Sequence, residues 1–178
     1  MKRWGHIFGT LALVTFLFVG CGTENGKEIS QTELNPVEVA ESVYNMIYNP
    51  SKTDGLYEKC VESINQFTNN EERKAVVTSK LVFDTTLLHI AASKGLYSIC
   101  EWLIKNGADV SAINGHSYTP LHDAARTGHI AICELLMNQE VWSYSLDVDS
   151  PQFTNTSPLH EAAICGHSAV CQLLIDRH

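Results

Sequence analysis

The chain is poor in basic residues. Its 178 residues include 12 Lys and Arg against 20 Asp and Glu, which gives a formal net charge of −8 at pH 7. A surface that binds the phosphates of a nucleic acid needs clustered Lys and Arg. This balance excludes nucleic acid from the partners that we expect.

Motifs for catalysis and for cofactor binding are also missing. The sequence has no Gly-rich phosphate loop, no G-x-S-x-G and no H-E-x-x-H. Six Cys and eight His are present, but no two of them show a metal-like local spacing such as C-x-x-C. We therefore expect no enzymatic activity, no cofactor and no bound metal.

No apolar run is long enough to cross a bilayer, which takes about 20 residues. The longest run covers residues 7–19 and follows a basic head, Lys2-Arg3. A charged head and a short apolar segment are typical of an export signal. Residues 1–20 are therefore predicted to be a signal peptide.

The signal ends at Phe18-Val19-Gly20-Cys21, which resembles the bacterial lipobox. The resemblance implies that Cys21 is lipidated with acyl chains such as palmitate. Residues 21–35 are polar and are predicted to be a flexible tether. Gly22 in place of Asp resembles the sorting signal of an outer-membrane lipoprotein, which would face the periplasm or the cell surface. The alternative is a plain signal peptide or an uncleaved membrane anchor, with no modification of Cys21.

One ten-residue phrase occurs three times. It reads TLLHIAASKG from Thr86, TPLHDAARTG from Thr119 and SPLHEAAICG from Ser157, at spacings of 33 and 38 residues. The hydroxyl at its start suits a helix N-cap, and the closing glycine suits a left-handed residue where the helix ends. A second apolar helix follows each copy, beginning near Ile99, Ile132 and Val170.

The phrase resembles the ankyrin repeat, whose signature is T-P-L-H-x-A at a period of 33. The resemblance implies an all-α ankyrin-repeat solenoid, with repeats at 84–116, 117–154 and 155–178. It also implies that His89, His122 and His160 form bonds within and between repeats. Cys100, Cys133 and Cys171 share one register position and are predicted to be buried thiols. Pairing of Cys60 with Cys165 stays open.

The segment 36–83 lacks the phrase but has a helical pattern. Apolar residues recur on one face from Val37 to Ile47 and again from Leu56 to Phe67, with a weaker third pattern at 71–79. Terminal units of a solenoid are expected to be atypical, because their outer face meets water. We predict a helical N-terminal cap, or one degenerate repeat, over 36–83.

Ankyrin proteins usually bind a partner with the concave face that their first helices and turns form. Five residues at such positions are predicted to contact a protein partner: His116 and Tyr118 on a turn, and Asp123, Arg126 and Glu161 on the first helices. Asp123 and Glu161 are interpreted as a solvated acidic stripe. The less favoured alternative is that these two carboxylates act in a hydrolase.

The second repeat departs from the pattern by five additional residues. The insertion lies in the segment 140–154 and brings large apolar side chains onto a loop: Trp142, Tyr144, Leu146 and Phe153. Aromatic residues are common binding hot spots, so this finger is a second candidate for partner contact. Packing of Trp142 onto the second helices is the competing interpretation.

The features together predict a membrane-tethered protein–protein interaction module in the bacterial envelope. It resembles bacterial ankyrin-repeat lipoproteins, some of which are immunity proteins that inhibit a toxin. Others assist a periplasmic enzyme of the oxidative-stress type. We expect a monomer that binds a protein partner and reaches the membrane through Cys21.

Overall fold

The computed structural model describes residues 35–49, 55–139 and 156–177. They belong to one compact unit, Leu34–His178. All regular structure in these ranges is helical: α1 (Pro36–Tyr48), α2 (Leu56–Asn65), α3 (Asn70–Thr78), the short 3₁₀ helix η1 (Val82–Asp84), α4 (Leu87–Ser93), α5 (Tyr97–Lys105), α6 (Pro120–Thr127), α7 (Ile130–Met137), α8 (Pro158–Ile164) and α9 (Ser168–Asp176).

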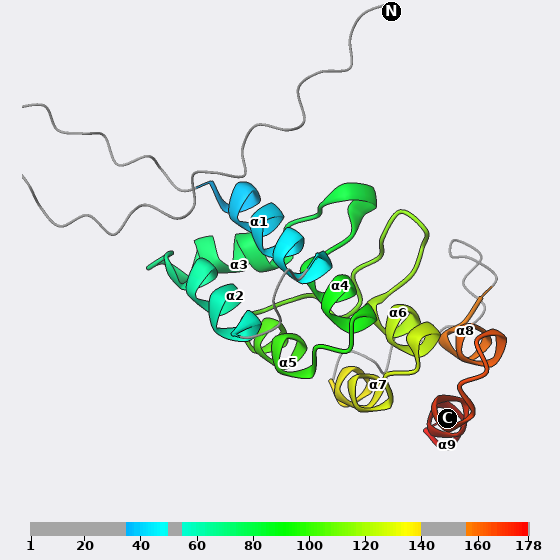
Figure 1. Cartoon of the computed structure of the whole chain (residues 1–178). Helices are drawn as coiled ribbons and strands as arrows, with labels where there is room; N and C mark the ends of the chain where they lie inside the picture. Colours follow the sequence, from blue (N-terminus) through cyan, green and yellow to red (C-terminus); the bar gives the residue numbers. More distant parts are fainter. Residues whose placement is uncertain (1–34, 50–54, 140–155, 178) are drawn as a thin grey trace, which may run out of the picture. The chain divides into compact units, whose positions relative to one another are not determined.

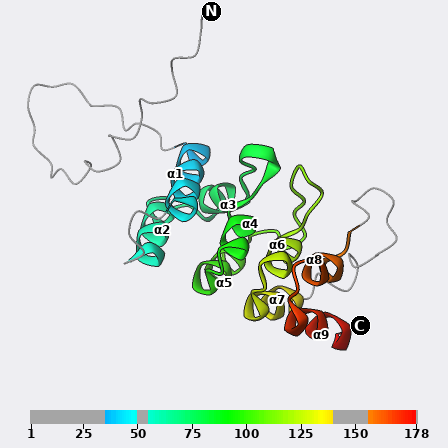
Figure 2. The same ribbon diagram turned by 45° about the vertical axis from the view of Figure 1, so that its right-hand side comes forward.

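The helices pack as pairs that repeat in space. Each first helix contacts the next, α4 against α6 and α6 against α8, and the second helices α5, α7 and α9 contact one another in the same order. Figures 1 and 2 show these two rows side by side. The chain therefore has the all-α repeat architecture that the sequence predicts.

The ends of the first helices follow from the repeated phrase. Thr86, Thr119 and Ser157 each form a capping box with the histidine three residues later. Gly95, Gly128 and Gly166 end the helices at φ angles of 74°, 79° and 76°. Since L-residues rarely occupy this left-handed region, the glycines allow the sharp reversal into the second helix.

The N-terminal helices continue the stack. Helix α1 packs against α4 and α2 against α5, so the α1–α2 pair occupies the place of a repeat, and α3 lies against both α1 and α2. Asn35 caps α1 by accepting a hydrogen bond from the Val37 N–H at 3.0 Å, and Pro36 stands at the first helical position. The α1–α2 pair thus stacks on α4 and α5 as one helix pair stacks on the next, and α3 is an additional helix in 36–83.

The described cysteines are all free thiols. Cys100 and Cys133 are fully buried, as predicted, and burial raises the pKa of each thiol to about 12. Cys60 is also buried and unpaired, whereas Cys165 is exposed. The prediction for Cys171 is wrong in part: its side chain is only half-buried, because no described element covers the outer side of α9.

Several predicted features lie outside the described residues. They are the signal peptide 1–20 with Cys21, nearly all of the tether 21–35, and the finger with Trp142, Tyr144, Leu146 and Phe153. Among the helices that the structure does describe, none is both long and apolar enough to cross a membrane.

Candidate protein-binding surface

Two motif histidines join neighbouring repeats. Nδ1 of His89 lies 3.2 Å from the backbone N of Thr86, and Nε2 lies 2.9 Å from the carbonyl oxygen of Tyr118 in the next repeat. A backbone N–H only donates, so Nδ1 accepts and the proton is on Nε2. His122 repeats the arrangement, with Nε2 at 3.2 Å from the Thr156 carbonyl oxygen.

These histidines have a structural role, because each one bonds its own helix cap and the next repeat. An imidazole that accepts at Nδ1 and donates at Nε2 must be neutral. His89 is fully buried, and burial lowers the pKa of its imidazole, an effect that the hydrogen bond to the Tyr118 carbonyl partly opposes. Burial also lowers the pKa of His122. The predicted bonds within and between repeats are confirmed for both residues, and each bond fixes the turn that carries the next repeat.

Aromatic rings line the turns that these histidines hold. The ring centroid of Phe83 lies 5.9 Å from that of His116, and His116 lies 6.5 Å from Tyr118. Tyr118 in turn stacks on His122 at 5.4 Å. The apolar Val82 and Phe83 are 64% and 70% exposed, which is unusual for such side chains. We call Val82, Phe83, His116 and Tyr118 the turn surface.

The backbone of the turn surface is strained. Phe83, Asp84 and Ser117 have φ angles of 56°, 54° and 62°, and none of them is a glycine. The two turns meet where the Gly115 N–H donates to the Phe83 carbonyl oxygen at 2.6 Å. A Cβ on Gly115 would lie 3.1 Å from that oxygen, closer than most such contacts, so a larger residue would require the Phe83 carbonyl to shift by a few tenths of an ångström. Strained residues cluster at functional sites more often than elsewhere.

The two predicted carboxylates are not a solvated stripe. Asp123 and Glu161 are only 7% and 6% exposed. Asp123 accepts a hydrogen bond from Arg126 Nη2 at 3.2 Å, and Glu161 accepts one from the Tyr118 hydroxyl at 3.0 Å. Burial raises the pKa of Asp123, and burial followed by the bond to Glu161 raises the pKa of the Tyr118 hydroxyl. The prediction of solvation is wrong, because both side chains are nearly buried, Glu161 against the Tyr118 hydroxyl of the turn before α6 and Asp123 beside Arg126.

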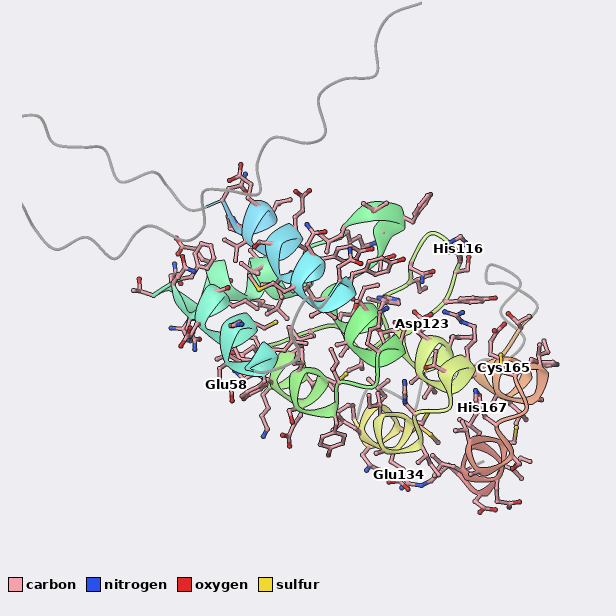
Figure 3. All side chains as sticks on the ribbon, viewed as in Figure 1. Glu58, His116, Asp123, Glu134, Cys165 and His167 are labelled. Atoms are coloured by element: carbon pink, nitrogen blue, oxygen red, sulfur yellow. The ribbon has the colours of Figure 1, made fainter. Side chains whose placement is uncertain are left out.

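Of the two carboxylates, Glu161 stabilises a turn. The bond from Tyr118 to Glu161 links the turn before α6 to the first turn of α8, so Glu161 positions a ring of the turn surface. Figure 3 shows His116 on the turn that projects beyond α6, with Asp123 nearer the helix rows. Of the described residues predicted to contact a partner, His116 and Tyr118 lie on the turn surface, and Arg126 is exposed on α6.

Sequence reasoning missed Val82 and Phe83. They lie four and three residues before the first phrase, at the positions that Gly115 and His116 occupy before the second phrase. The repeat register therefore contains the signal, since Phe83 aligns with His116, but the helical pattern of 36–83 assigns the segment to the cap. In the part of the chain that the structure describes, no group of three or more His, Cys, Asp or Glu is arranged to hold a metal ion.

A model of the family described as ankyrin repeats (3 copies) matches residues 56–145 and 88–178. Together these matches cover more than half of the sequence. The chain belongs to the ankyrin-repeat family. It is accordingly a protein–protein interaction module.

Curated relatives share parts of this region. The chain is 40% identical over 53 residues to protein phosphatase 1 regulatory subunit 12A of Mus musculus, which is 30% of this chain and 5% of that protein. It is 42% identical over 52 residues to RelA-associated inhibitor of Mus musculus, 29% of this chain and 6% of that protein. Over 79 residues it is 35% identical to I-Kappa-B like protein G1 of Microplitis demolitor bracovirus, 43% of this chain and 45% of that protein. The matched stretches thus span less than half the length of each relative.

Proposed function

We propose that the protein binds a protein partner through the turn surface and, in doing so, inhibits that partner without catalysing a reaction. The observation that carries the proposal is Phe83, a large apolar side chain that is 70% exposed on a left-handed backbone. The strain has no evident benefit for the fold, because a glycine would fit this φ angle without it. Contact between a partner and the exposed ring would explain why a phenylalanine occupies this strained position.

The names of two relatives support the inhibitory part. One is a RelA-associated inhibitor and another an I-Kappa-B like protein, and both share the repeat region with this chain. We further propose that the protein acts in the bacterial envelope as an immunity protein that captures a toxin, held at the membrane by lipid on Cys21. This part is supported by the sequence pattern of residues 1–21 and by the acidic net charge.

The test of binding uses Phe83→Gly, which removes the ring and keeps the φ angle. Tyr97→Ala is the matched control, because Tyr97 is a 43% exposed aromatic residue on α5, away from the turn surface. Proteins that co-purify with the wild type from its native host are measured by quantitative mass spectrometry. We expect the partner to be retained by Tyr97→Ala and to lose about 2 kcal/mol of binding, roughly 30-fold, with Phe83→Gly.

Urea unfolding of both variants accompanies this measurement. Substitution of an exposed side chain usually changes the free energy of unfolding by no more than about 0.5 kcal/mol. If both variants stay within this range, a loss of binding cannot be caused by unfolding. A partner that Phe83→Gly retains at full affinity would refute the turn surface as the binding site. Trp142→Ala, tested in parallel, reports on the predicted finger.

The envelope assignment has its own test. Cys21→Ser is expected to abolish incorporation of labelled palmitate and to leave an unlipidated precursor or a soluble form. A variant that still takes up the label, or that is recovered as unchanged mature protein that requires detergent, would contradict lipidation at Cys21. The toxin assignment predicts that cells expressing the captured partner survive only when the wild-type chain is present.

A further inference from the structure

Two Asn-Gly pairs lie in the part of the chain that the structure describes, Asn106–Gly107 and Asn114–Gly115, and a further pair at 25–26 lies outside it. Asparagine followed by glycine is prone to spontaneous deamidation, because glycine has no side chain to obstruct the attack of its own backbone nitrogen on the asparagine side chain. In a folded protein the outcome depends on how that nitrogen and that side chain are held.

Deamidation consumes water and releases ammonia. Hydroxide removes the proton of the glycine N–H, and the nitrogen then attacks Cγ of the asparagine. The new N–Cγ bond closes a succinimide ring, the Cγ–Nδ2 bond breaks, and the amide nitrogen takes a proton from water and leaves as ammonia. Water then opens the ring at either of its carbonyl carbons, which gives aspartate or isoaspartate.

The attacking nitrogen of the second pair is held by the neighbouring turn. The Gly115 N–H donates to the Phe83 carbonyl oxygen at 2.6 Å. This bond must be given up before the nitrogen can lose its proton and turn toward the Asn114 side chain. The acceptor is 32 positions away in the sequence, so the protection is lost when the two turns separate.

The side chain under attack is held by its own turn. Oδ1 of Asn114 accepts hydrogen bonds from the backbone N–H groups of His116 at 2.9 Å and Tyr118 at 3.1 Å. Asn114 is only 8% exposed, and its own N–H donates to the Tyr118 carbonyl oxygen at 3.0 Å. Asn114 therefore fixes the turn that carries His116 and Tyr118, which belong to the turn surface.

The pair Asn106–Gly107 is held by local bonds instead. The Gly107 N–H donates to the Ile104 carbonyl oxygen at 3.0 Å, and Nδ2 of Asn106 donates to the Trp102 carbonyl oxygen at 2.8 Å. Both acceptors belong to α5, the helix that ends at this pair. Separation of the two turns leaves these bonds in place, so Asn106 is an internal reference for Asn114.

We propose that Asn114 is a deamidation site whose reaction begins when the Gly115 N–H loses the Phe83 carbonyl. Loops and turns of native proteins open locally without global unfolding. An aspartate at 114 keeps an oxygen acceptor for both backbone N–H groups. An isoaspartate adds a methylene group to the backbone, so it no longer holds His116 and Tyr118 in their positions, and the change is irreversible.

The test follows both pairs in the full-length protein at mildly alkaline pH, in native buffer and in urea. Peptide mapping by mass spectrometry measures the conversion of each asparagine, and isoaspartate-specific enzymatic methylation identifies that product. In urea both pairs should convert at similar rates. In native buffer Asn114 should convert at least about tenfold more slowly than in urea, which corresponds to a local opening that costs about 1.4 kcal/mol or more.

Two substitutions of Phe83 test the role of its carbonyl. Proline cannot adopt the φ angle of 56°, so Phe83→Pro should move the carbonyl away from Gly115. Phe83→Gly is the matched control, because it removes the ring but keeps the φ angle and the carbonyl. Phe83→Pro should accelerate the conversion of Asn114 at least about tenfold and leave Asn106 unchanged. Phe83→Gly should leave both rates as in the wild type.

Hydrogen exchange of the Gly115 N–H in the wild type measures the same opening without a substitution. Its exchange should be slowed by about the same factor as the conversion of Asn114. This measurement decides the matter if Phe83→Pro accelerates both pairs, which would show general unfolding of that variant.

Three results would overturn the proposal: equal Asn114 rates in native buffer and urea, an unchanged Asn114 rate in a folded Phe83→Pro, or fast exchange of the Gly115 N–H in a protein whose Asn114 is protected. None of these measurements involves a binding partner. The modification is therefore independent of the proposed function, and failure of partner binding would not alter its result.

Discussion

Replacement of Gly128 by alanine is expected to cost far more stability than the same replacement at Gly166. The two residues have nearly equal φ angles, 79° and 76°, so the strain of a left-handed alanine is common to both. That strain is about 1–2 kcal/mol. The alanine also reduces the entropy of the unfolded chain, which offsets about 0.4–1 kcal/mol. Gly166→Ala should therefore lower the free energy of unfolding by about 1 kcal/mol.

Gly128→Ala carries a second cost. Its Cβ would lie 2.6 Å from Nδ1 and 2.7 Å from Cε1 of His167, closer than real contacts allow. The ring cannot move freely, because its Nε2 is 3.0 Å from the Arg126 carbonyl oxygen. Overpacking of this kind costs about 1–3 kcal/mol. The total for Gly128→Ala is then about 2–4 kcal/mol.

Urea unfolding followed by circular dichroism measures both values, and an unchanged m-value shows that the same transition is compared. The double variant Gly128→Ala/His167→Ala separates the ring contact from backbone strain, because adjacent sites couple. It should be more stable than the sum of the single changes predicts. Equal costs for Gly128→Ala and Gly166→Ala, or strict additivity in the double variant, would refute packing of the imidazole on the glycine.

Three further predictions concern titration, reactivity and hydrogen bonding. Burial lowers the pKa of His89 below its ordinary 6.5, so the unfolded chain binds a proton at a higher pH than the folded chain does. The free energy of unfolding should therefore fall as the pH drops below about 6.5. His89→Asn should reduce this pH dependence in urea titrations at several pH values. Iodoacetamide should alkylate the exposed Cys165 in the native protein but should alkylate Cys100 only after unfolding, since burial raises the Cys100 pKa to about 12. Peptide mapping measures both reactions, and equal rates for the two thiols would contradict the burial of Cys100. Tyr118→Phe should cost about 1–3 kcal/mol in urea unfolding, because Glu161 loses its hydroxyl donor in a nearly buried position; an unchanged midpoint would show that the bond contributes nothing.

The repeat architecture was predictable because its signals are local and occur three times. The hydroxyl of Thr119, the proline after it and Gly128 each have a conformational reason that applies within one helix. Agreement between copies then fixed the register, and the register placed Cys100 and Cys133 in the core. The interhelical role of His89 and His122 came from the family resemblance and not from spacing.

The errors have a common physical origin in contacts between repeats. Asp123 and Glu161 look like solvated residues on a first helix, since the helix alone leaves them exposed. Both are nearly buried in the stack, and Glu161 is bonded there by Tyr118, which lies on the turn of the preceding unit. Cys171 was placed in the core by analogy with Cys133, but the analogy holds only where a further unit covers the helix. The burial of a residue in a repeat depends on the neighbouring units and cannot be predicted from the sequence of that repeat alone.

Phe83 illustrates a second limit. Its φ angle depends on the contact between its own turn and the turn of Gly115, and the two residues are 32 positions apart in the sequence. Propensity favours Phe in extended backbone, so no local rule predicts a left-handed Phe83. The strained position follows only when the stack fixes both turns.

The comparison of repeats separates the residues that build the stack from those that are free to differ. The motif histidine, the paired alanines and the helix-ending glycine are the same in all three copies. In the first two copies the histidine and the glycine contact the next unit, and both alanines are fully buried. The position after the histidine, by contrast, is Ile90, Asp123 or Glu161, and the turn positions vary as well. Stacking places no common demand on these sites, so they can diverge without loss of the fold. Specificity for a partner is therefore expected to reside in the variable turn residues, and the rigid histidine-linked rows hold those residues in place.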